Sequence, residues 1–345
     1  MAYERGEDIR HFIVHQVGKH SGIAKLAAEK FGVTPHAVRW HLRQLLTENI
    51  LVADGKTRDR TYRLKSEEWI KSYSTAEGVK EDAAWNDAAP VVGDLPENVL
   101  SIWNTGFTEM FNNAIDHAEA TEIRVKIRKT AIDTEIEIQD NGIGIFKKIQ
   151  AALKHPEERH AIIELSKGKF TTDRTKHSGQ GIFFTSKMVD SFDILSGELS
   201  FTRTRTPTGS KGTTVWMKLD NESTRAPADI YNEYSGEEFD FGFDKTKVPI
   251  KMAQFVGHRL VSRSQAKRIL ARLGEFKAAS FDFAGVDMIG QAFADEIFRV
   301  FHDAHPDIRL EVVNAEPDVA KMIERALRES TSLNAPEIAS GNQMP

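Results

Sequence analysis

A carboxylate and an amide stand one helical turn apart in the segment EMFNNAIDH, residues 109–117. Residues four apart lie on the same side of an α-helix, so Glu109 and Asn113 would project in the same direction. Their neighbours Phe107 and Phe111 are apolar, which predicts a mostly buried helix. A carboxylate on such a helix could act as a general base, and purely local hydrogen bonding of both groups is the alternative.

A second acidic group ends a predicted strand in DTEIEIQDNGIGI, residues 133–145. Asp140 can accept a hydrogen bond from an adenine amino group, while Gly142 and Gly144 let the backbone approach a ligand closely. The same residues could instead form an ordinary tight turn.

Two more glycines stand directly before an apolar helix in KHSGQGIFFTSKMVDSF, residues 176–192. Gly179 and Gly181 would leave backbone N–H groups and the positive end of the helix dipole available to phosphate oxygens. Farther along, KGTTVWMKL at residues 211–219 combines a glycine and two hydroxyl groups with a strand.

Alternating apolar and charged residues predict the strands that position these groups. Ile123, Val125 and Ile127 alternate with charged residues, and Ile136 and Ile138 do the same in the following segment. Both segments are therefore predicted to be strands that bury one face.

These four segments, in this order and at these separations, resemble the GHKL family of ATP-binding domains, which includes DNA gyrase, histidine kinases and anti-sigma serine kinases. The resemblance covers about residues 93–222 and implies an α+β domain of the Bergerat type, an α/β sandwich, with ATP and Mg²⁺ as ligands. It implies that Asn113 holds the metal and that Asp140 takes the adenine amino group. The implied catalytic residue is Glu109, and the implied nucleotide-binding residues are Asn113, Asp140, Gly142, Gly144, Lys167, Lys169, Gly179, Gly181 and Thr213.

The same resemblance makes the segment from Phe146 to His177 a mobile lid over ATP. Four of its cationic residues could approach the phosphates, or they could form a solvated face. They are Lys167, Lys169, Arg174 and Lys176.

Glu109 separates the activities found among GHKL proteins. Histidine kinases usually have an amide at this position and precede the domain with a long hairpin, for which residues 66–93 are too short. In the hydrolases the glutamate activates water, and in the anti-sigma serine kinases it deprotonates a hydroxyl group. A magnesium-dependent ATPase is therefore the main interpretation, and a serine/threonine protein kinase acting on a separate partner is the alternative.

Three helical patterns and a predicted hairpin make up the N-terminal residues. The helical patterns cover residues 9–17, 21–32 and 34–50, and the hairpin follows at residues 50–64. Helices followed by a basic hairpin resemble a winged helix. Residues 1–65 carry 12 Lys/Arg against 7 Asp/Glu, a net +5, whereas the rest carries 34 against 44, a net −10. This asymmetry favours DNA binding, and a protein-interaction module is the alternative. The predicted DNA contacts are His36, Arg39, Trp40, Arg43, Lys56, Arg58 and Arg60.

The C-terminal residues alternate between strand and helix, which predicts a small α/β domain. Strands are expected at 248–252, 278–283 and 308–313, and helices at 264–273, 290–304 and 317–328. The stretch SFDFAGVDMIGQAFADEIF resembles the STAS domain of anti-sigma-factor antagonists, and still more the STAS-like domains of unknown function found behind GHKL domains.

One departure from the antagonist pattern concerns its consecutive serines. This chain has Gly290, Gln291, Ala292 and Phe293 there, so phosphorylation of this domain by its own ATPase is unsupported. The domain is interpreted as a docking or sensing module, unless its polar residues only coat an exposed helix. The residues named for docking are Asp287, Gln291, Asp295 and Glu296.

The predicted fold class is multidomain, with an all-α winged-helix N-terminal domain, an α+β ATP-binding domain and a small α/β C-terminal domain. The predicted segments are a winged helix-turn-helix at 1–66, a linker at 67–92, the GHKL domain at 93–222, a linker at 223–246, the STAS-like domain at 247–330 and a disordered tail at 331–345.

The predicted function is transcription regulation, in which the nucleotide state of the GHKL domain controls DNA binding through residues 34–62. An ATP-gated protein scaffold is a further alternative. The 345 residues contain no cysteine, and no apolar run approaches the roughly 18 residues of a membrane span. We therefore expect a cytoplasmic protein without a membrane partner. The partner of the STAS-like domain stays unidentified, and a homodimer stays open.

Overall fold

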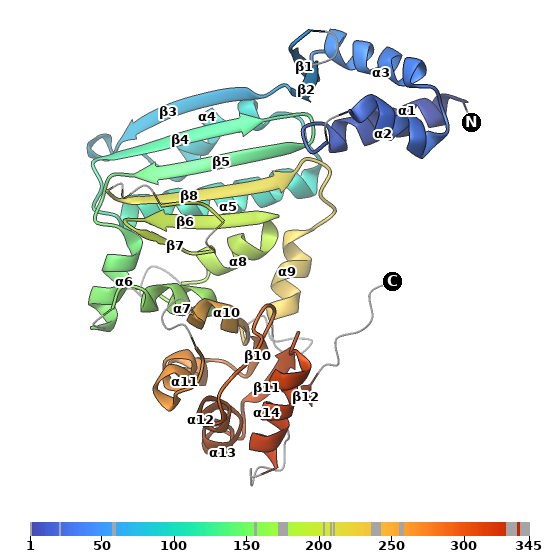
Figure 1. The fold of residues 1–345 in the computed structure, drawn as a ribbon. Coiled ribbons are helices and arrows are strands. Elements are labelled where there is room, and N and C mark those ends of the chain that lie inside the picture. The colour runs from blue at the N-terminus through green and yellow to red at the C-terminus, as the bar shows by residue number, and fades with distance from the viewer. Residues whose placement is uncertain are drawn as a thin grey trace.

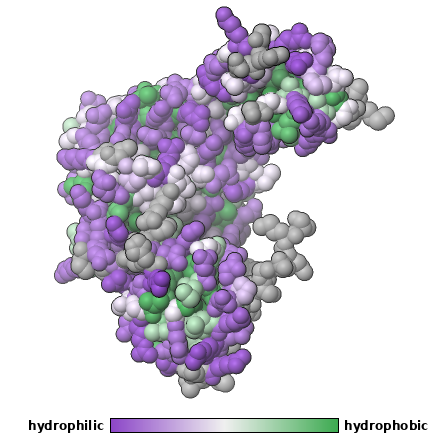
Figure 2. Space-filling view, viewed as in Figure 1, coloured by the Kyte–Doolittle hydropathy of each residue, from purple (hydrophilic) through white to green (hydrophobic). Residues whose placement is uncertain are grey.

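The computed structural model describes residues 2–20, 22–56, 60–154, 157–171, 179–202, 204–207, 209, 211–235, 243–254, 259–328 and 337–338. Figure 1 shows a helical N-terminal part, a central sheet with helices packed against it, and a smaller C-terminal part. Figure 2 shows hydrophilic side chains over most of the same face and a group of apolar ones on the C-terminal part. None of the described helices is both long and apolar enough to cross a membrane.

Three helices and a hairpin form the N-terminal part. They are α1 (Ala2–Gln16), α2 (Ile23–Phe31), α3 (Pro35–Thr47), β1 (Leu51–Asp54) and β2 (Thr61–Leu64), and the two strands pair antiparallel. Helix α3 begins after Thr34, whose hydroxyl oxygen accepts a hydrogen bond from the Ala37 amide. Ile13, Val38 and Leu42 belong to a hydrophobic core that is separate from the rest of the molecule.

The central sheet has six antiparallel strands in the order β3-β4-β5-β8-β6-β7. Their bounds are β3 (Glu67–Ser74), β4 (Glu122–Lys129), β5 (Asp133–Asp140), β8 (Thr213–Asp220), β6 (Ser191–Ser196) and β7 (Leu199–Ser200). The alternation seen in the sequence is confirmed, because Val125, Ile127, Ile136 and Ile138 are all buried. The helices α4 (Glu81–Val92), α5 (Glu97–Asp116) and α8 (Gly181–Met188) pack on this buried face.

Residues 67–92, predicted as a linker, belong to the central fold instead. Strand β3 pairs with β4 along its whole length, a 3-10 turn covers Thr75–Glu77, and α4 buries Ala84 and Ala88 against α5. Tyr73 is the one buried side chain of β3, so an edge strand with little apolar patterning was not apparent in the sequence. Only Lys65 and Ser66 separate β2 from β3.

The C-terminal part is a parallel sheet in the order β12-β11-β10-β9 with helices packed against it. Its strands are β9 (Lys245–Pro249), β10 (Ala278–Asp282), β11 (Arg309–Val313) and β12 (Glu337–Ile338). Its helices are α10 (Ile250–Gln254), α11 (Arg263–Leu270), α12 (Gln291–Asp295), the π-helical turn Glu296–Phe301, α13 (His302–Ala304) and α14 (Pro317–Leu327).

Two boundaries in the C-terminal part differ from the prediction. The strand expected at 248–252 starts earlier and ends at Pro249, because proline offers no amide to a sheet and suits a helix start. Residues 337–338, expected within a disordered tail, pair with β11 as strand β12. The remainder of 331–345 lies outside the described residues.

One hydrophobic core joins the central and C-terminal parts. The second predicted linker, 223–246, contributes to it, because α9 (Pro227–Tyr234) and Phe243 pack into the core. The Phe243 ring lies 4.6 Å from that of Phe183 in α8 and 5.4 Å from that of Phe276 in the C-terminal part. Residues 236–242 lie outside the described part of the chain. The two parts are thus packed together rather than joined by an extended connector.

Candidate functional site

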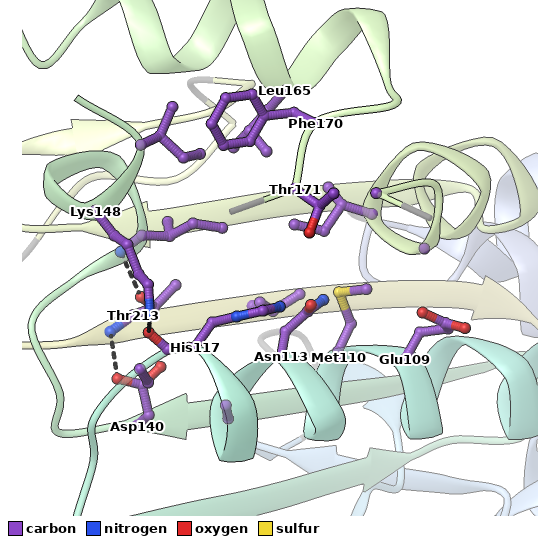
Figure 3. A pocket seen from close by; sticks show the side chains of 18 of the residues that line it. Glu109, Met110, Asn113, His117, Asp140, Lys148, Leu165, Phe170, Thr171 and Thr213 are labelled. Atoms are coloured by element: carbon purple, nitrogen blue, oxygen red, sulfur yellow. Dashed lines mark hydrogen bonds between the residues drawn. The ribbon is translucent and has the colours of Figure 1, made fainter. Parts of the chain in front are cut away.

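A pocket lies between α5, the end of β5, α8 and the helices α6 (Ile145–Leu153) and α7 (His160–Lys167). Figure 3 shows Glu109, Asn113 and His117 in succession along α5, with Asp140 and Thr213 at the His117 end. The pocket therefore has one carboxylate near each end and an amide between them. Gly179 and Gly181 also line it, so segments far apart in the sequence meet at one site.

Asp140 is fixed in the pocket by its backbone neighbours. It is buried, and its Oδ1 accepts hydrogen bonds from the amides of Gly142 at 2.8 Å and Thr213 at 3.2 Å. Burial raises the pKa of Asp140 above its usual value, and the hydrogen bonds from Gly142 and Thr213 oppose that rise. The result is a desolvated, oriented acceptor, which suits recognition of an amino group.

Gly142 is needed where the turn after β5 meets the end of α5. A Cβ atom at this position would overlap the backbone carbonyl of Ala118. The neighbouring amide of Ile143 donates to that same carbonyl at 2.9 Å. Close backbone contact therefore places the turn, and with it Asp140, against the end of the α5 helix.

Glu109 lies against the first residue of α8. A Cβ atom at Gly181 would overlap Glu109 Oε2, so this approach requires glycine. The start of a helix carries partial positive charge and exposed N–H groups, which favour anions. Burial raises the pKa of the Tyr231 phenol in α9, and the charge of nearby Glu109 raises it further. The carboxylate and the helix start thus share one end of the pocket.

Lys148 is a pocket residue that the sequence analysis missed. Its Nζ donates a 2.6 Å hydrogen bond to the carbonyl of His117, and it is the only Lys or Arg among the described residues that line the pocket. Two isoleucines of α6, Ile145 and Ile149, line the pocket together with Lys148. The three residues therefore share one face of the helix. A lysine on an apolar helical face was the signal that could have identified it.

Replacing Lys148 with methionine is expected to weaken nucleotide binding about tenfold, roughly 1.4 kcal/mol, through loss of a charged partner in the pocket. Methionine keeps the length of the stem and removes the ammonium group. The measurement is the Kd of ATP by calorimetry. Lys147→Met is the matched control, because Lys147 is exposed on the same helix. Equal affinities of the two variants would contradict a role for Lys148.

Lys167 and Lys169 do not point into the pocket, so their predicted approach to the phosphates is wrong in this structure. Lys167 is fully buried and donates to Glu164 Oε1 at 2.7 Å and to the Ala271 carbonyl at 2.6 Å. Lys169 donates to the Glu275 carbonyl at 2.7 Å. Burial lowers the pKa of Lys167, and Glu164 opposes that shift. The C-terminal part supplies partners that the local sequence could not reveal.

Arg174 and Lys176, the other two lid residues predicted to approach the phosphates, lie outside the described residues. Arg58 of the predicted DNA contacts lies outside them as well.

The other predicted DNA contacts are on the surface of the N-terminal part. The exposed residues are His36, Arg39, Trp40, Arg43, Lys56 and Arg60. Trp40 is 52% exposed, which is unusual for so large an apolar side chain. The outward direction predicted for α3 is confirmed, and contact with DNA stays a prediction.

The four acidic or amide residues named for docking in the C-terminal part separate into two pairs. Asp287 and Gln291 are exposed, whereas Asp295 and Glu296 are buried. Asp295 Oδ2 accepts hydrogen bonds from Arg299 at 2.8 Å and Arg263 at 3.0 Å. Bonds from Arg299 lower the pKa of Asp295. The prediction is therefore wrong for Asp295 and Glu296, since both side chains are buried within the fold.

Two family models match the chain. Residues 104–223 match the model described as histidine kinase-, DNA gyrase B- and HSP90-like ATPase, and residues 265–320 match a STAS-like domain of unknown function. The chain therefore contains a GHKL-type domain followed by a STAS-like domain, called below the central and C-terminal domains. The first match implies ATP binding with a kinase-like or ATPase-like regulatory function. No curated protein matches the chain.

Proposed function

We propose that the protein is a magnesium-dependent ATPase whose nucleotide state controls DNA binding by an N-terminal winged helix. The observation that carries the proposal is the alignment of Asp140, Asn113 and Glu109 along one pocket, with Glu109 against the start of α8. An acceptor for adenine, a ligand for a metal and a base near a phosphate-binding helix start are the groups that ATP hydrolysis requires.

The residues present fit ATP and a magnesium ion. Asp140 offers a fixed carboxylate to the adenine amino group, and Thr213 supports it from β8. Asn113 offers an amide oxygen, a hard ligand of the kind that Mg²⁺ accepts alongside nucleotide phosphates. The bound ion would neutralise charge on the phosphate oxygens. The amides at the start of α8 would bind the phosphates directly.

Glu109 is the proposed general base. A water molecule attacks the γ-phosphorus, the bond to the bridging oxygen of ADP breaks, and Glu109 takes the proton that the water loses. Binding phosphate at the α8 start brings the nucleophile and the base to the same end of the pocket. A turnover assay that identifies the products tests this, with ADP and inorganic phosphate expected from the wild-type chain.

A protein kinase is the second candidate, and the position of Glu109 suits a hydroxyl nucleophile equally well. The segment 290–293 carries no hydroxyl group at the acceptor position of the antagonists, and the proposed acceptor is a hydroxyl group on a separate protein. Radiolabelled ATP incubated with candidate STAS-domain proteins separates the two activities. Label on the partner supports the kinase, and inorganic phosphate without such label supports the ATPase.

The proposed DNA-binding surface rests on exposure and charge. Arg39, Trp40 and Arg43 are exposed on α3, and the first 65 residues carry a net charge of +5 although the whole chain carries −5. This part meets the central domain at the two-residue connection before β3, and the His11 ring lies 3.9 Å from Glu222 Oε2. A short connection to the sheet gives nucleotide state a physical route to the surface.

Replacing both Arg39 and Arg43 with alanine is expected to weaken DNA binding about 100-fold and to reduce the slope of log affinity against log salt by about 2, because two phosphate contacts are lost. Fluorescence anisotropy over a range of salt concentrations measures both quantities. The control is Lys321→Ala/Arg325→Ala, which removes two exposed charges from α14.

Unchanged DNA affinity in the Arg39/Arg43 variant would favour the protein-scaffold interpretation of the N-terminal part. The coupling has its own test in the same assay, repeated without nucleotide, with ATP and with ADP. Identical affinities in the three states would contradict control by nucleotide.

A further inference from the structure

Helix α7 is enclosed on all sides, which is unusual for a helix in the predicted position of a lid. All eight of its residues are buried, including Glu164 and Lys167. Leu165 lines the nucleotide pocket, whereas Glu164 and Lys167 contact the C-terminal domain. Figure 1 shows α7 between the central sheet and the C-terminal part. A wall of the pocket is therefore also an interdomain contact.

The C-terminal domain holds α7 through the end of α11. Lys167 Nζ donates to the carbonyls of Ala271 at 2.6 Å and Arg268 at 3.3 Å, which end that helix. A cation there satisfies carbonyl groups that have no partner within the helix. In return, the Thr246 hydroxyl of β9 donates to the Lys167 carbonyl at 2.7 Å.

Arg272 makes the second connection, and it reaches the chain directly after α7. Its guanidinium donates to Glu164 Oε2 at 3.1 Å, to the Lys169 carbonyl at 2.7 Å and to Glu275 Oε2 at 2.8 Å. The planar fork of arginine can serve several acceptors in fixed directions, which a lysine cannot do. Arg272 has a φ of 62°, a left-handed backbone that non-glycine residues adopt at a cost.

Only a few atoms separate Arg272 from the pocket. Its guanidinium carbon lies 5.2 Å from the centre of the Phe170 ring, and Phe170 and Thr171 line the pocket. Residues 169–170 also press on the glycine that precedes α8, since a Cβ atom at Gly179 would lie 2.6 Å from the carbonyl oxygen of Phe170. The segment that Arg272 holds is thus in contact with the phosphate end of the site.

We infer that Arg272, although it belongs to the C-terminal domain, is a positioning residue for the nucleotide site of the central domain, acting through residues 168–171. The identity of the ligand, ATP, rests on the proposed function. The STAS-like domain is then a structural part of the ATP site, and a partner that moves the turn after α11 changes nucleotide affinity. By linkage, bound nucleotide must stabilise the same interdomain contact to an equal extent.

Arg272→Gly is the informative variant, because glycine accepts the left-handed backbone and removes only the side chain. Calorimetry with a non-hydrolysable ATP analogue and magnesium is expected to show a Kd about tenfold higher than wild type, with one site per chain. This lies within the roughly 5- to 150-fold coupling between linked sites. Partial unfolding would instead lower the number of sites and leave Kd unchanged.

Arg299→Ala is the matched control, because Arg299 forms a bidentate pair with Asp295 inside the C-terminal domain. Its Kd is expected to stay within twofold of wild type. The Kd of Arg272→Lys is expected to stay close to that of Arg272→Gly, because an ammonium group cannot serve Glu164 and the Lys169 carbonyl with the same geometry.

Hydrogen exchange without nucleotide gives an independent readout. Amides of residues 160–171 are expected to exchange at least about tenfold faster in Arg272→Gly than in wild type or Arg299→Ala, because a lost contact lowers the local opening free energy. If Arg272→Gly showed the wild-type exchange rates in this segment, or the wild-type Kd, the inference would be overturned. Absence of nucleotide binding by the wild-type chain would count against the proposed function, and exchange would still decide whether Arg272 holds the segment.

Discussion

Glu109→Gln is expected to lower ATP turnover about 10²- to 10⁴-fold, the range contributed by a positioned general base. Glutamine has the same shape and can still lie against Gly181, but its amide cannot take a proton from the nucleophile. ATP affinity should stay within about twofold, because the base acts on the attacking group and the binding contacts remain. Phosphate release measures turnover, and calorimetry on the same preparation measures affinity.

The control for Glu109 is Glu97→Gln, an exposed position in the first turn of the same helix. It should turn over ATP at the wild-type rate. Full turnover by Glu109→Gln would contradict the role of Glu109 in either the ATPase or the kinase interpretation. A parallel loss of turnover and affinity would instead assign Glu109 to binding.

Asp140→Asn is expected to weaken ATP binding at least about 100-fold, roughly 2.7 kcal/mol. The asparagine carbonyl can keep the bonds from the Gly142 and Thr213 amides, so the fold of the turn should survive. Its amino group would then face the adenine amino group, donor against donor. A titration with ATP measures the loss, and thermal unfolding without nucleotide reports on the fold.

Inosine triphosphate provides the complementary test of Asp140, since it carries an oxygen acceptor in place of the adenine amino group. The wild-type chain should prefer ATP strongly, and Asp140→Asn should lose most of that preference. Equal selectivity in the two proteins would show that Asp140 does not read the base.

The sequence was sufficient to predict the strands β4 and β5, the segments that meet at the pocket and most of the C-terminal alternation. These rest on local patterns: Val125, Ile127, Ile136 and Ile138 alternate with charge, and glycines stand where backbones approach closely. Periodicity of this kind depends only on which face is buried. The residues of the pocket could be predicted because several short segments resemble those of one family and occur in the same order as in that family.

The features that the sequence did not predict share a different cause, since each feature depends on residues distant in the chain. Lys167 is buried because Ala271 and Arg268 accept its hydrogen bonds, and nothing near residue 167 indicates that. Strand β3 was assigned to a linker because its edge position requires little apolar patterning. Lys148 was not predicted because a lysine beside apolar residues usually extends its ammonium group into solvent.

The central claim is that one ATP binds with magnesium in the pocket lined by Glu109, Asn113 and Asp140. Calorimetric titration of the wild-type chain with ATP, in magnesium and again with the metal chelated, tests it most directly. We predict one site per chain in magnesium and clearly weaker binding after chelation, because Asn113 and the phosphates then lack their shared ion. Absence of saturable ATP binding in magnesium, or an affinity that chelation leaves unchanged, would contradict the account.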